Sequence, residues 1–305
     1  MSHTKTLPPP LRAWAERSVG PLGAVHDASH PRADSRVWDI ADAQGRRFFV
    51  KQSPTPKFYE RETFGYQSAV PALGFGGAPR LVASDARNLA LLLTAVPGTP
   101  LSLLTLTATA HRSAHRQFGA LLRRLHGSDR MPGAGRRAAE EAAEHAATTG
   151  VEKHLVRAGA LLTDHRRALV RRAAEHLLQL TDRLVPAHIH GDAQERNALW
   201  TGAGAGTGAG SGRLAVIDFE RSRYAPAVQD FVRLACGPWQ DRPDLRDAFF
   251  HGYGRTLTDA ERQALTCLAA LDAVSGLAYG PAHGDHEVTE RGTRTLERLE
   301  RGLFV

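Results

Sequence analysis

A cluster of proline and glycine at residues 94–100 constrains the fold most, because it separates two parts of the chain with different residue patterns. Directly before it, residues 89–93 form a continuous apolar run, which predicts a strand buried on both faces. From residue 101 onward, apolar residues recur at helical spacing. We therefore predict an α+β protein of two lobes: a small β-rich N-terminal lobe with one main helix (residues 1–94), a hinge (95–100) and a larger, mostly helical C-terminal lobe (101–305).

The N-terminal part shows the signals of a strand followed by a helix. The turn Gly45-Arg46-Arg47 leads into a strand over 48–51, and a helix is expected over 57–73, where glycines 74, 76 and 77 end it. Residues 1–10 are polar and Pro-rich and lack the apolar core of a secretory signal. We expect them to form a frayed leader.

Beyond the hinge, the pattern predicts helices around one short hairpin. The hairpin strands are expected over 197–200 and 214–217, joined by residues 201–212, which are almost entirely Gly, Ala, Thr and Ser. That segment contains no phosphate-loop pattern and precedes no helix, so we interpret it as a hairpin connection. Helices are expected on a face formed by Phe118, Leu121, Leu122 and Leu125, then within 136–172, and from 227 to the end.

Composition argues against several classes of partner. The formal net charge is +7, but the arginines are scattered along predicted helices, which favours a solvated surface over nucleic-acid binding. No apolar run approaches the roughly 18–20 residues that span a bilayer, so no membrane segment is expected. The two cysteines, Cys236 and Cys267, cannot build a disulfide framework and are expected in the core. We expect a cytoplasmic monomer or homodimer that binds a small molecule.

Three polar residues around the predicted hairpin suit phosphoryl transfer. That reaction needs a carboxylate to orient the attacking hydroxyl and accept its proton, and oxygen ligands to hold Mg²⁺ against the phosphates. Asp192 and Asn197 lie five residues apart in a loop that enters the first hairpin strand, and Asp218 ends the returning strand. The hairpin brings the strand ends together, so we predict Asn197 and Asp218 as metal ligands and Asp192 as the catalytic residue facing the substrate.

These residues resemble the aminoglycoside phosphotransferase and choline kinase-like family, which shares the protein kinase-like fold. The catalytic-loop pattern H-G-D-x-x-x-x-N is matched by His190–Asn197, and the metal-binding pattern by Asp218-Phe219-Glu220. Asp230 matches the aspartate of the following helix, where we expect it to brace the backbone of the catalytic loop. The resemblance implies a bilobal kinase that uses ATP, or alternatively GTP, together with Mg²⁺.

The resemblance also implies the nucleotide contacts in the first lobe. Lys51 matches the strand lysine that grips the phosphates, and Glu62 its helical partner, although Glu60 is an alternative partner. Backbone groups near Thr94 and Val96 would contact the base. No Gly-rich phosphate loop is present, and Ser35 is the candidate in the equivalent turn.

The acceptor is the least constrained part of the prediction. Glu195, Arg196 and Glu220 are candidate substrate residues, and Arg196 reaches either the transferred phosphate or Glu220. The expected acceptor is a hydroxylated small molecule, plausibly an antibiotic of aminoglycoside or nucleoside type. A primary metabolite such as a sugar or an amino alcohol is the alternative. The arginine-rich helical lobe favours a neutral or anionic acceptor.

Parts of the sequence also fit two other classes of function. His188-x-His190-x-Asp192 is also an H-x-H-x-D pattern that could hold zinc in a metal-dependent hydrolase. A kinase-like binding module without activity is a further alternative, although the catalytic and metal residues are all present. Only eleven residues separate Asp218 from Asp230, which is too short for the activation segment of a protein kinase.

Overall fold

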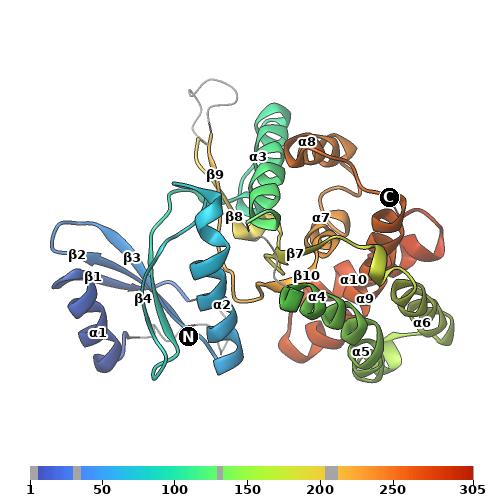
Figure 1. Ribbon diagram of the computed structural model, residues 1–305, viewed down its shortest axis with the longest axis horizontal. Coiled ribbons are helices and arrows are strands. Elements are labelled where there is room, and N and C mark those ends of the chain that lie inside the picture. Colours follow the sequence, from blue (N-terminus) through green and yellow to red (C-terminus); the bar gives the residue numbers. More distant parts are fainter. Residues whose placement is uncertain (1–5, 30–35, 129–132, 203–211, 305) are drawn as a thin grey trace.

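The computed structural model describes residues 6–29, 36–128, 133–202 and 212–304. Its N-terminal part is a five-stranded antiparallel sheet in the order β1-β2-β3-β5-β4, and its C-terminal part is mostly helical (Figure 1). This confirms the predicted α+β class. The strands are β1 (Leu22–Asp27), β2 (Val37–Asp42), β3 (Arg47–Gln52), β4 (Leu81–Asp85) and β5 (Ala90–Thr94).

Helices α1 (Pro9–Val19) and α2 (Pro56–Ser68) cover the two faces of the sheet. The side chains of β5 show that each helix covers one face, because successive side chains of a strand point to opposite faces. Ala90 and Leu92 join the apolar cluster that contains α1, whereas Leu91 and Leu93 join the cluster that contains the tyrosines of α2. The apolar run of β5 is thus buried on both faces, as predicted.

Two sequence predictions for this part were wrong. The lobe has two helices of comparable length, and the expected leader contributes to one of them: Pro9 begins α1, and Leu7 is only 9% exposed. Proline suits the first turn of a helix, where the N–H groups have no intrahelical partner, so the Pro-rich start marks a helix N-terminus. The helix expected over 57–73 ends at Ser68, and a 3₁₀ helix (Val70–Leu73) follows, because Pro71 cannot continue the α-helical hydrogen bonds.

The helical part is built around α9, which packs against α5, α6, α7 and α10. Phe118, Leu121, Leu122 and Leu125 are buried on one face of α3, as their spacing predicted. The helices are α3 (Ala108–His126), α4 (Gly133–His145), α5 (Val151–Ala158), α6 (Asp164–Leu178), α7 (Val232–Ala235), α8 (Pro243–Tyr253), α9 (Asp259–His283) and α10 (His286–Glu300).

The predicted hairpin is confirmed as the antiparallel pair β8 (Ala198–Trp200) and β9 (Leu214–Val216). Most of its connection, residues 203–211, lies outside the described residues, so the interpretation of the Gly-rich segment stays a prediction. A second short antiparallel pair consists of β7 (Pro186–Ile189) and β10 (Arg223–Pro226). In the sequence, β7 precedes the hairpin and β10 follows it. The loops between these strands carry all the predicted catalytic and metal residues.

Helix α9 bears on the expectation that the chain has no membrane segment. Among the helices of the described residues it is the one that is long and apolar enough, by length and composition, to cross a membrane. However, 67% of its most apolar stretch is buried inside the protein. A helix that is apolar on most sides is expected at the centre of a large core. Both cysteines are buried, with Cys267 on α9.

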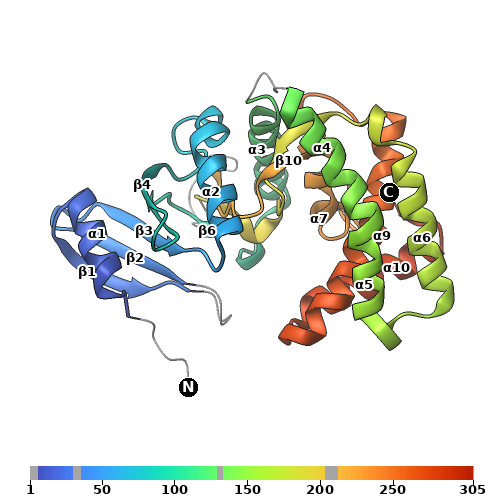
Figure 2. The same cartoon turned by 60° about the horizontal axis from the view of Figure 1, so that its bottom comes forward.

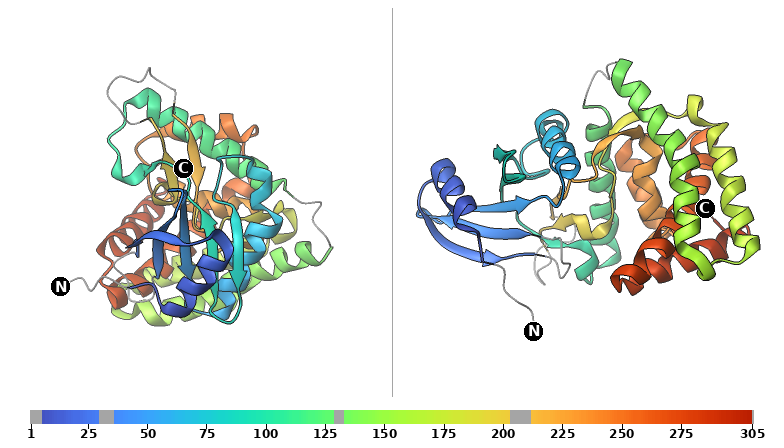
Figure 3. Two further views of the ribbon diagram at one scale, coloured as in Figure 1. Left: turned by 90° about the vertical axis from the view of Figure 1, so that its left-hand side faces the viewer. Right: turned by 90° about the horizontal axis from the view of Figure 1, so that it is seen from below.

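The sheet and the helical part meet along α2 and the hairpin. Helix α2 lies between the two parts (Figure 2), which lie side by side in the right-hand view of Figure 3. After β5 the chain enters β6 (Thr99–Pro100), which pairs with β8, and the Val216 N–H donates to the Gly77 carbonyl at 2.9 Å. The hairpin is therefore held from both sides of the junction, which fixes where its loops lie.

Candidate active site

The backbone of the loop after β7 is fixed by one buried carboxylate. Asp230 accepts hydrogen bonds from the backbone N–H groups of His190 and Gly191, both at 2.7 Å, and interacts with His126 Nε2 at 3.0 Å. Gly191 has φ +80°, and a Cβ there would lie 2.2 Å from the Arg221 carbonyl oxygen, so only glycine fits. Asp230 thus braces the loop as predicted.

His190 is a scaffold residue whose two ring nitrogens are both engaged. Its Nε2 lies 2.9 Å from the Ile217 carbonyl oxygen, and its Nδ1 accepts from the Asp192 N–H at 3.3 Å. A carbonyl can only accept, so the neutral ring carries its proton on Nε2. The ring also packs on Phe219 with centroids 4.6 Å apart. This ring links the loop to the segment that follows β9.

Asp192 is 4% exposed, and its two carboxylate oxygens have different surroundings. Oδ2 accepts from Arg196 at 2.9 Å and from the Asn197 amide at 3.2 Å. Oδ1 is buried and has no hydrogen-bond partner within the described residues, with Arg233 Nε at 3.7 Å. Burial alone raises the pKa of Asp192, but Arg233, Arg196 and Arg221 outweigh it and hold the pKa well below its usual range. The group is therefore an anion with one oxygen unused.

Asp218 follows β9 in a left-handed backbone conformation, with φ +69°. Such a conformation costs about 1–3 kcal/mol in a residue other than glycine and is found mostly at functional sites. The Ile217 N–H donates to the Asn197 carbonyl at 3.0 Å, so the hairpin holds the two predicted metal ligands at its end. The Asn197 amide nitrogen is used by two bonds to Asp192, which leaves its oxygen for a cation.

Lys51 on β3 meets three carboxylates. Its Nζ donates to Glu62 Oε1 at 3.0 Å and to Asp218 Oδ1, and lies 3.3 Å from Glu220 Oε2. Glu62 is fully buried, whereas Glu60 is exposed, so Glu62 is the helical partner. Helix α2 packs against β4 and β5, on the same sheet as β3 (Figure 1). One lysine among three carboxylates leaves an excess of negative charge.

The charges of this cluster are strongly perturbed. Burial alone lowers the pKa of Lys51, but Asp218, Glu62 and Glu220 outweigh it and hold that pKa well above its usual range. Burial raises the pKa of Glu62 to about 7, against the opposing effect of Lys51. For Asp218 the attraction of Lys51 outweighs burial and lowers the pKa. The second oxygen of Glu62, Oε2, is buried without a hydrogen bond in the described structure.

The predicted base-contacting residues lie at the end of β5. The Thr94 N–H already donates to the Arg80 carbonyl at 2.9 Å, so that amide is used inside the sheet. Val96, two residues on, forms no backbone hydrogen bond within the described residues. Val96 is therefore better placed than the Thr94 amide to contact a base. Ser35 lies outside the described residues.

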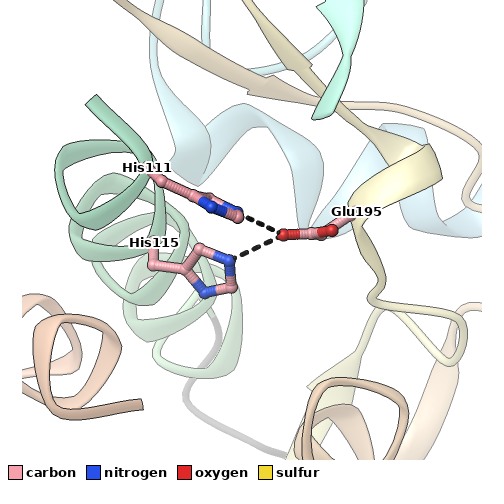
Figure 4. A group of neighbouring side chains, drawn as sticks. All are labelled: His111, His115 and Glu195. Carbon is pink, nitrogen blue, oxygen red and sulfur yellow. Dashed lines mark hydrogen bonds and ion pairs between the residues drawn. The ribbon is translucent and has the colours of Figure 1, made fainter. Parts of the chain in front are cut away.

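Sequence analysis missed the partners of Glu195 (Figure 4). Its Oε1 lies 2.7 Å from His111 Nε2 and 2.9 Å from His115 Nε2, both on α3. Burial alone raises the pKa of Glu195, but the hydrogen bonds of the two histidines outweigh it and lower the pKa to about 2. The i, i+4 spacing of the histidines was the signal available in the sequence, but nothing in it pointed to a partner 80 residues away.

The same three residues could be read as a metal site, because their ligand atoms lie within 4.8 Å of one another. The hydrogen bond of Trp239 argues against a metal. Trp239 Nε1 donates to His115 Nδ1 at 3.3 Å, so the neutral His115 ring carries its proton on Nε2 and donates it to Glu195. A metal-binding histidine instead donates from its far nitrogen. We therefore describe the group as a hydrogen-bonded clamp on the catalytic loop.

Arg196 and His188 also lie where the sequence could not place them. Arg196 pairs with Asp192, whereas Glu220 pairs with Lys51, so the suggested Arg196–Glu220 pair is wrong. The His188 ring packs against the rings of Phe64 and Tyr224, with Nε2 2.6 Å from Ser222 Oγ. Within the described residues, the H-x-H-x-D residues do not gather as a metal-binding group.

Comparisons with known proteins agree with this arrangement. The sequence matches the model of the phosphotransferase enzyme family (APH) over residues 29–285. A search of curated proteins found no match. Among solved structures, a protein described as a fructosamine-3-kinase from Thermobifida fusca YX-ER1 is similar, with a TM-score of 0.64 and 20% identity over 94% of this chain and 98% of that one.

Two further structures hold ligands. The GDP and kanamycin complex of APH(2")-IIia has a TM-score of 0.61 and 17% identity, over 93% of this chain and 95% of that one. A thermostable mutant of aminoglycoside phosphotransferase APH(4)-Ia, in a ternary complex with AMP-PNP and hygromycin B, has a TM-score of 0.65 and 13% identity, over 95% of this chain and 98% of that one. At these identities the similarity establishes the kinase-like fold.

Proposed function

The chain belongs to the phosphotransferase enzyme family, and we propose that it moves the γ-phosphoryl group of ATP to a hydroxyl group of a small molecule. The observation that carries the proposal is Asp192 Oδ1, a buried anionic oxygen without a hydrogen bond in the described structure. A hydroxyl donated to that oxygen would be oriented for attack and would find an acceptor for its proton. Arg196 and Asn197 hold the other oxygen and so fix the carboxylate plane.

The residues around Lys51 fit a divalent cation. Asp218, Glu220 and Glu62 share one lysine, which leaves an excess of negative charge, and Asn197 adds a neutral oxygen. Hard oxygen ligands of this kind suit Mg²⁺. We assign Asn197 and Asp218 as its ligands, with Glu220 beside them. Bound Mg²⁺ neutralises charge on the phosphates, while Lys51 provides the protein's own cation for them.

The nucleotide is assigned to the junction between the sheet and the helical part. Lys51, held by Glu62, would contact the phosphates, and backbone groups at Val96 and Thr94 would contact the base. We also propose Ser35 for the phosphates and residues 95–100 as a hinge between lobes 1–94 and 101–305. ATP is favoured over GTP as a default, and related structures hold both AMP-PNP and GDP.

The acceptor is a hydroxylated small molecule. Kanamycin and hygromycin B in related structures support an antibiotic, and the protein described as a fructosamine-3-kinase supports a metabolite with a sugar group. Glu195, Arg196 and Glu220 all have ion-pair partners in the chain, so the acceptor would have to compete for them. The assay panel therefore covers antibiotics, sugars and amino alcohols. A cytoplasmic location, as a monomer or homodimer, completes the proposal.

ATP turnover against that panel tests the function, with Asp192→Ala as the companion variant. We expect Mg²⁺-dependent transfer to at least one acceptor, and a loss in kcat of about 100-fold or more in the variant. Binding of a fluorescent ATP analogue should survive, because Asp192 lies on the acceptor side of the metal ligands. Near-normal kcat in Asp192→Ala would contradict the assignment. Activity that needs zinc and ignores Mg²⁺ would instead favour the hydrolase alternative.

A further inference from the structure

Three arginines next to the catalytic loop form no ion pair with a carboxylate within the described residues. They are Arg61 on α2, Arg221 in the segment after Glu220, and Arg223 at the start of β10. The only bond that any of their guanidinium groups makes in the described structure runs from Arg223 Nη1 to the Arg221 carbonyl oxygen, at 2.9 Å. All three are only partly exposed. Most other arginines near the active site pair with an acid, as Arg196 and Arg233 do.

The chain brings these arginines together at one packed junction. A Cβ on Gly65 of α2 would lie 2.6 Å from Ser222 Oγ, and the Phe64 ring lies 5.9 Å from the Tyr224 ring. Arg61 lies one helical turn before Gly65, on the same face of α2. Helix α2 therefore sets Arg61 against the segment that carries Arg221 and Arg223.

The same junction reaches the catalytic loop. A Cβ on Gly191 would lie 2.9 Å from Arg223 Nη1. Asp230 is the carboxylate whose charge raises the pKa of Arg223. Its oxygens already interact with two backbone N–H groups and with His126. No carboxylate within the described residues is thus left to neutralise Arg223.

Electrostatics shows that this arrangement is costly without a counter-ion. Burial and then the charge of Arg221 lower the pKa of Arg61. Burial, Arg61 and Arg221 lower the pKa of Arg223 to about 10, against the opposing effect of Asp230. Buried charges in proteins are normally paired, because an unpaired one loses its hydration without compensation. Three like charges that repel one another are the arrangement expected of a binding site for an anion.

We propose that Arg61, Arg221 and Arg223 form a binding site for a phosphate dianion at this junction between α2, the segment 221–223 and the catalytic loop. Planar guanidinium groups bind phosphate oxygens in pairs, and three of them match a doubly charged group better than a single carboxylate. The occupant would join α2, which carries Glu62, to the catalytic loop at Gly191. Its source is free phosphate, a phosphorylated small molecule, or a phosphorylated side chain of this protein.

Binding of inorganic phosphate tests the site without relying on activity. Calorimetric titration is done on the full-length protein with saturating ADP and Mg²⁺, so that the nucleotide site is filled. Arg61→Gln and Arg221→Gln are the variants, and Arg87→Gln, an exposed arginine in the β4–β5 turn, is the matched control. We expect the wild type and Arg87→Gln to bind equally, and each site variant to bind at least 10-fold more weakly. Equal binding by all four proteins, or by none, would overturn the proposal.

Melting temperature without phosphate gives a second, independent readout. Arg61 and Arg221 make no ion pair in the described structure, so replacing either should leave the melting temperature unchanged or raise it, since a repulsion is removed. A purely structural arginine would lower it. Each melting temperature is compared with that of Arg87→Gln, which also loses one arginine. A clear fall in both site variants would contradict the site.

The source of the phosphate is distinguished by intact mass. If the purified protein gains a phosphoryl group on incubation with ATP and Mg²⁺, and the modified protein no longer binds inorganic phosphate, the occupant is a side chain of the chain itself. Unchanged mass with binding of inorganic phosphate assigns the site to a free or small-molecule phosphate. Both results support the arginine site, and neither depends on finding the acceptor of the kinase reaction.

Discussion

Asp218 reaches Lys51 because its backbone adopts the left-handed conformation after β9. Asn197 faces the same space from the other hairpin strand, but it is neutral and its amide nitrogen is already bonded to Asp192. The two residues are therefore not equivalent as ligands. Removing Asp218 takes away a charge as well as an oxygen, whereas removing Asn197 takes away only an oxygen and the support of Asp192.

Asn197→Ala and Asp218→Ala should both raise the Mg²⁺ concentration needed for half-maximal turnover. We expect a change on the order of 10-fold for Asn197→Ala and a larger one for Asp218→Ala. Magnesium titrations of the initial rate measure it. Asp247→Ala is a suitable control, since the side chain of Asp247 is 73% exposed and lies outside the site. An unchanged Mg²⁺ requirement in Asp218→Ala would refute the metal assignment.

Glu62 makes a prediction about pH. Its pKa is raised to about 7 in the folded protein, above the ordinary value of 4.5, so the folded state binds more protons between those values than the unfolded state does. The contribution of Glu62 to stability therefore decreases as pH rises from about 4.5 to about 7. The lowered pKa of Asp218 acts in the opposite sense, and only in acid below its ordinary value.

Urea unfolding of the metal-free protein between pH 5 and 8 measures this effect. Wild type and Glu62→Gln are compared at each pH, so that histidines that titrate in the same range cancel. The variant should gain stability relative to wild type as pH rises, because it removes a buried group that becomes charged. Glu60→Gln, an exposed neighbour on α2, should show no such trend. A difference that is independent of pH would mean that Glu62 is already charged at pH 5.

Residue contacts were predictable where local spacing determines them. The sequence favoured Glu62 and kept Glu60 as an alternative, and the ion pair of Lys51 with Glu62 decides between them. The assignment of His190–Asn197 as the catalytic loop stays a prediction. The clamp on Glu195 was not predictable, because His111 lies 84 residues away in sequence and meets it only through the packing of α3. For the same reason the sequence could not decide the partner of Arg196. Charged side chains choose among several partners, and that choice is made by tertiary packing.

At the scale of elements, α3 and α8 approach unusually closely through two glycines. A Cβ on Gly119 would lie 2.0 Å from the Phe249 carbonyl oxygen, and one on Gly252 would lie 1.8 Å from the Arg116 carbonyl oxygen. Both contacts involve backbone, which cannot rotate away as a side chain can. The close packing against α8 fixes the position of α3. It thereby also fixes the histidines of α3 that contact Glu195 in the catalytic loop.

Gly119→Ala should force these helices apart and destabilise the protein by about 1–3 kcal/mol or more. The gain in helix propensity, up to about 1 kcal/mol, does not offset a backbone clash of this kind. Gly133→Ala is the matched control, since among the described residues its Cβ would meet only the end of the Arg137 side chain, at 3.7 Å. Denaturant unfolding compares the two. Equal stability of Gly119→Ala and wild type would show that the helices can separate without cost.

The spacing of apolar residues predicted α3, because this helix has a single buried face. It predicted the hairpin because each strand is an unbroken apolar run. It fails for α1, because the Pro-rich residues 1–10 predict a leader, whereas proline is also common at helix starts and α1 begins at Pro9. It also overran α2, because the apolar spacing continues through Val70 and Leu73 although the backbone changes to a 3₁₀ helix. Apolar pattern reports which face is buried and is insensitive to small changes of backbone winding.

For the molecule as a whole, the apolar residues form two main clusters of unequal size. The smaller one lies between α1 and one face of the sheet, and the larger one runs from α2 through the helical part. Helix α2 belongs to the sheet by sequence but shares its core with the helices. The lobe boundary predicted at residues 95–100 therefore does not coincide with a boundary between cores, and sequence order alone could not show this.

Leu11→Ala tests whether the smaller cluster unfolds separately. Leu11 is 1% exposed and lies entirely in that cluster, so we expect a loss of about 2–5 kcal/mol confined to α1 and the sheet. Differential scanning calorimetry should then show an early transition that moves to higher temperature with AMP-PNP and Mg²⁺, because a ligand bound through Lys51 on β3 stabilises the folded sheet.

The matched variant is Leu265→Ala on α9, which is also 1% exposed but lies in the larger cluster. It should lower the main transition and leave the early one in place. The different responses follow from the two clusters meeting only across the strands of the sheet, where side chains on opposite faces do not touch. If Leu11→Ala and Leu265→Ala both lower one common transition by similar amounts, α2 couples the two cores so strongly that the protein unfolds as a single cooperative unit.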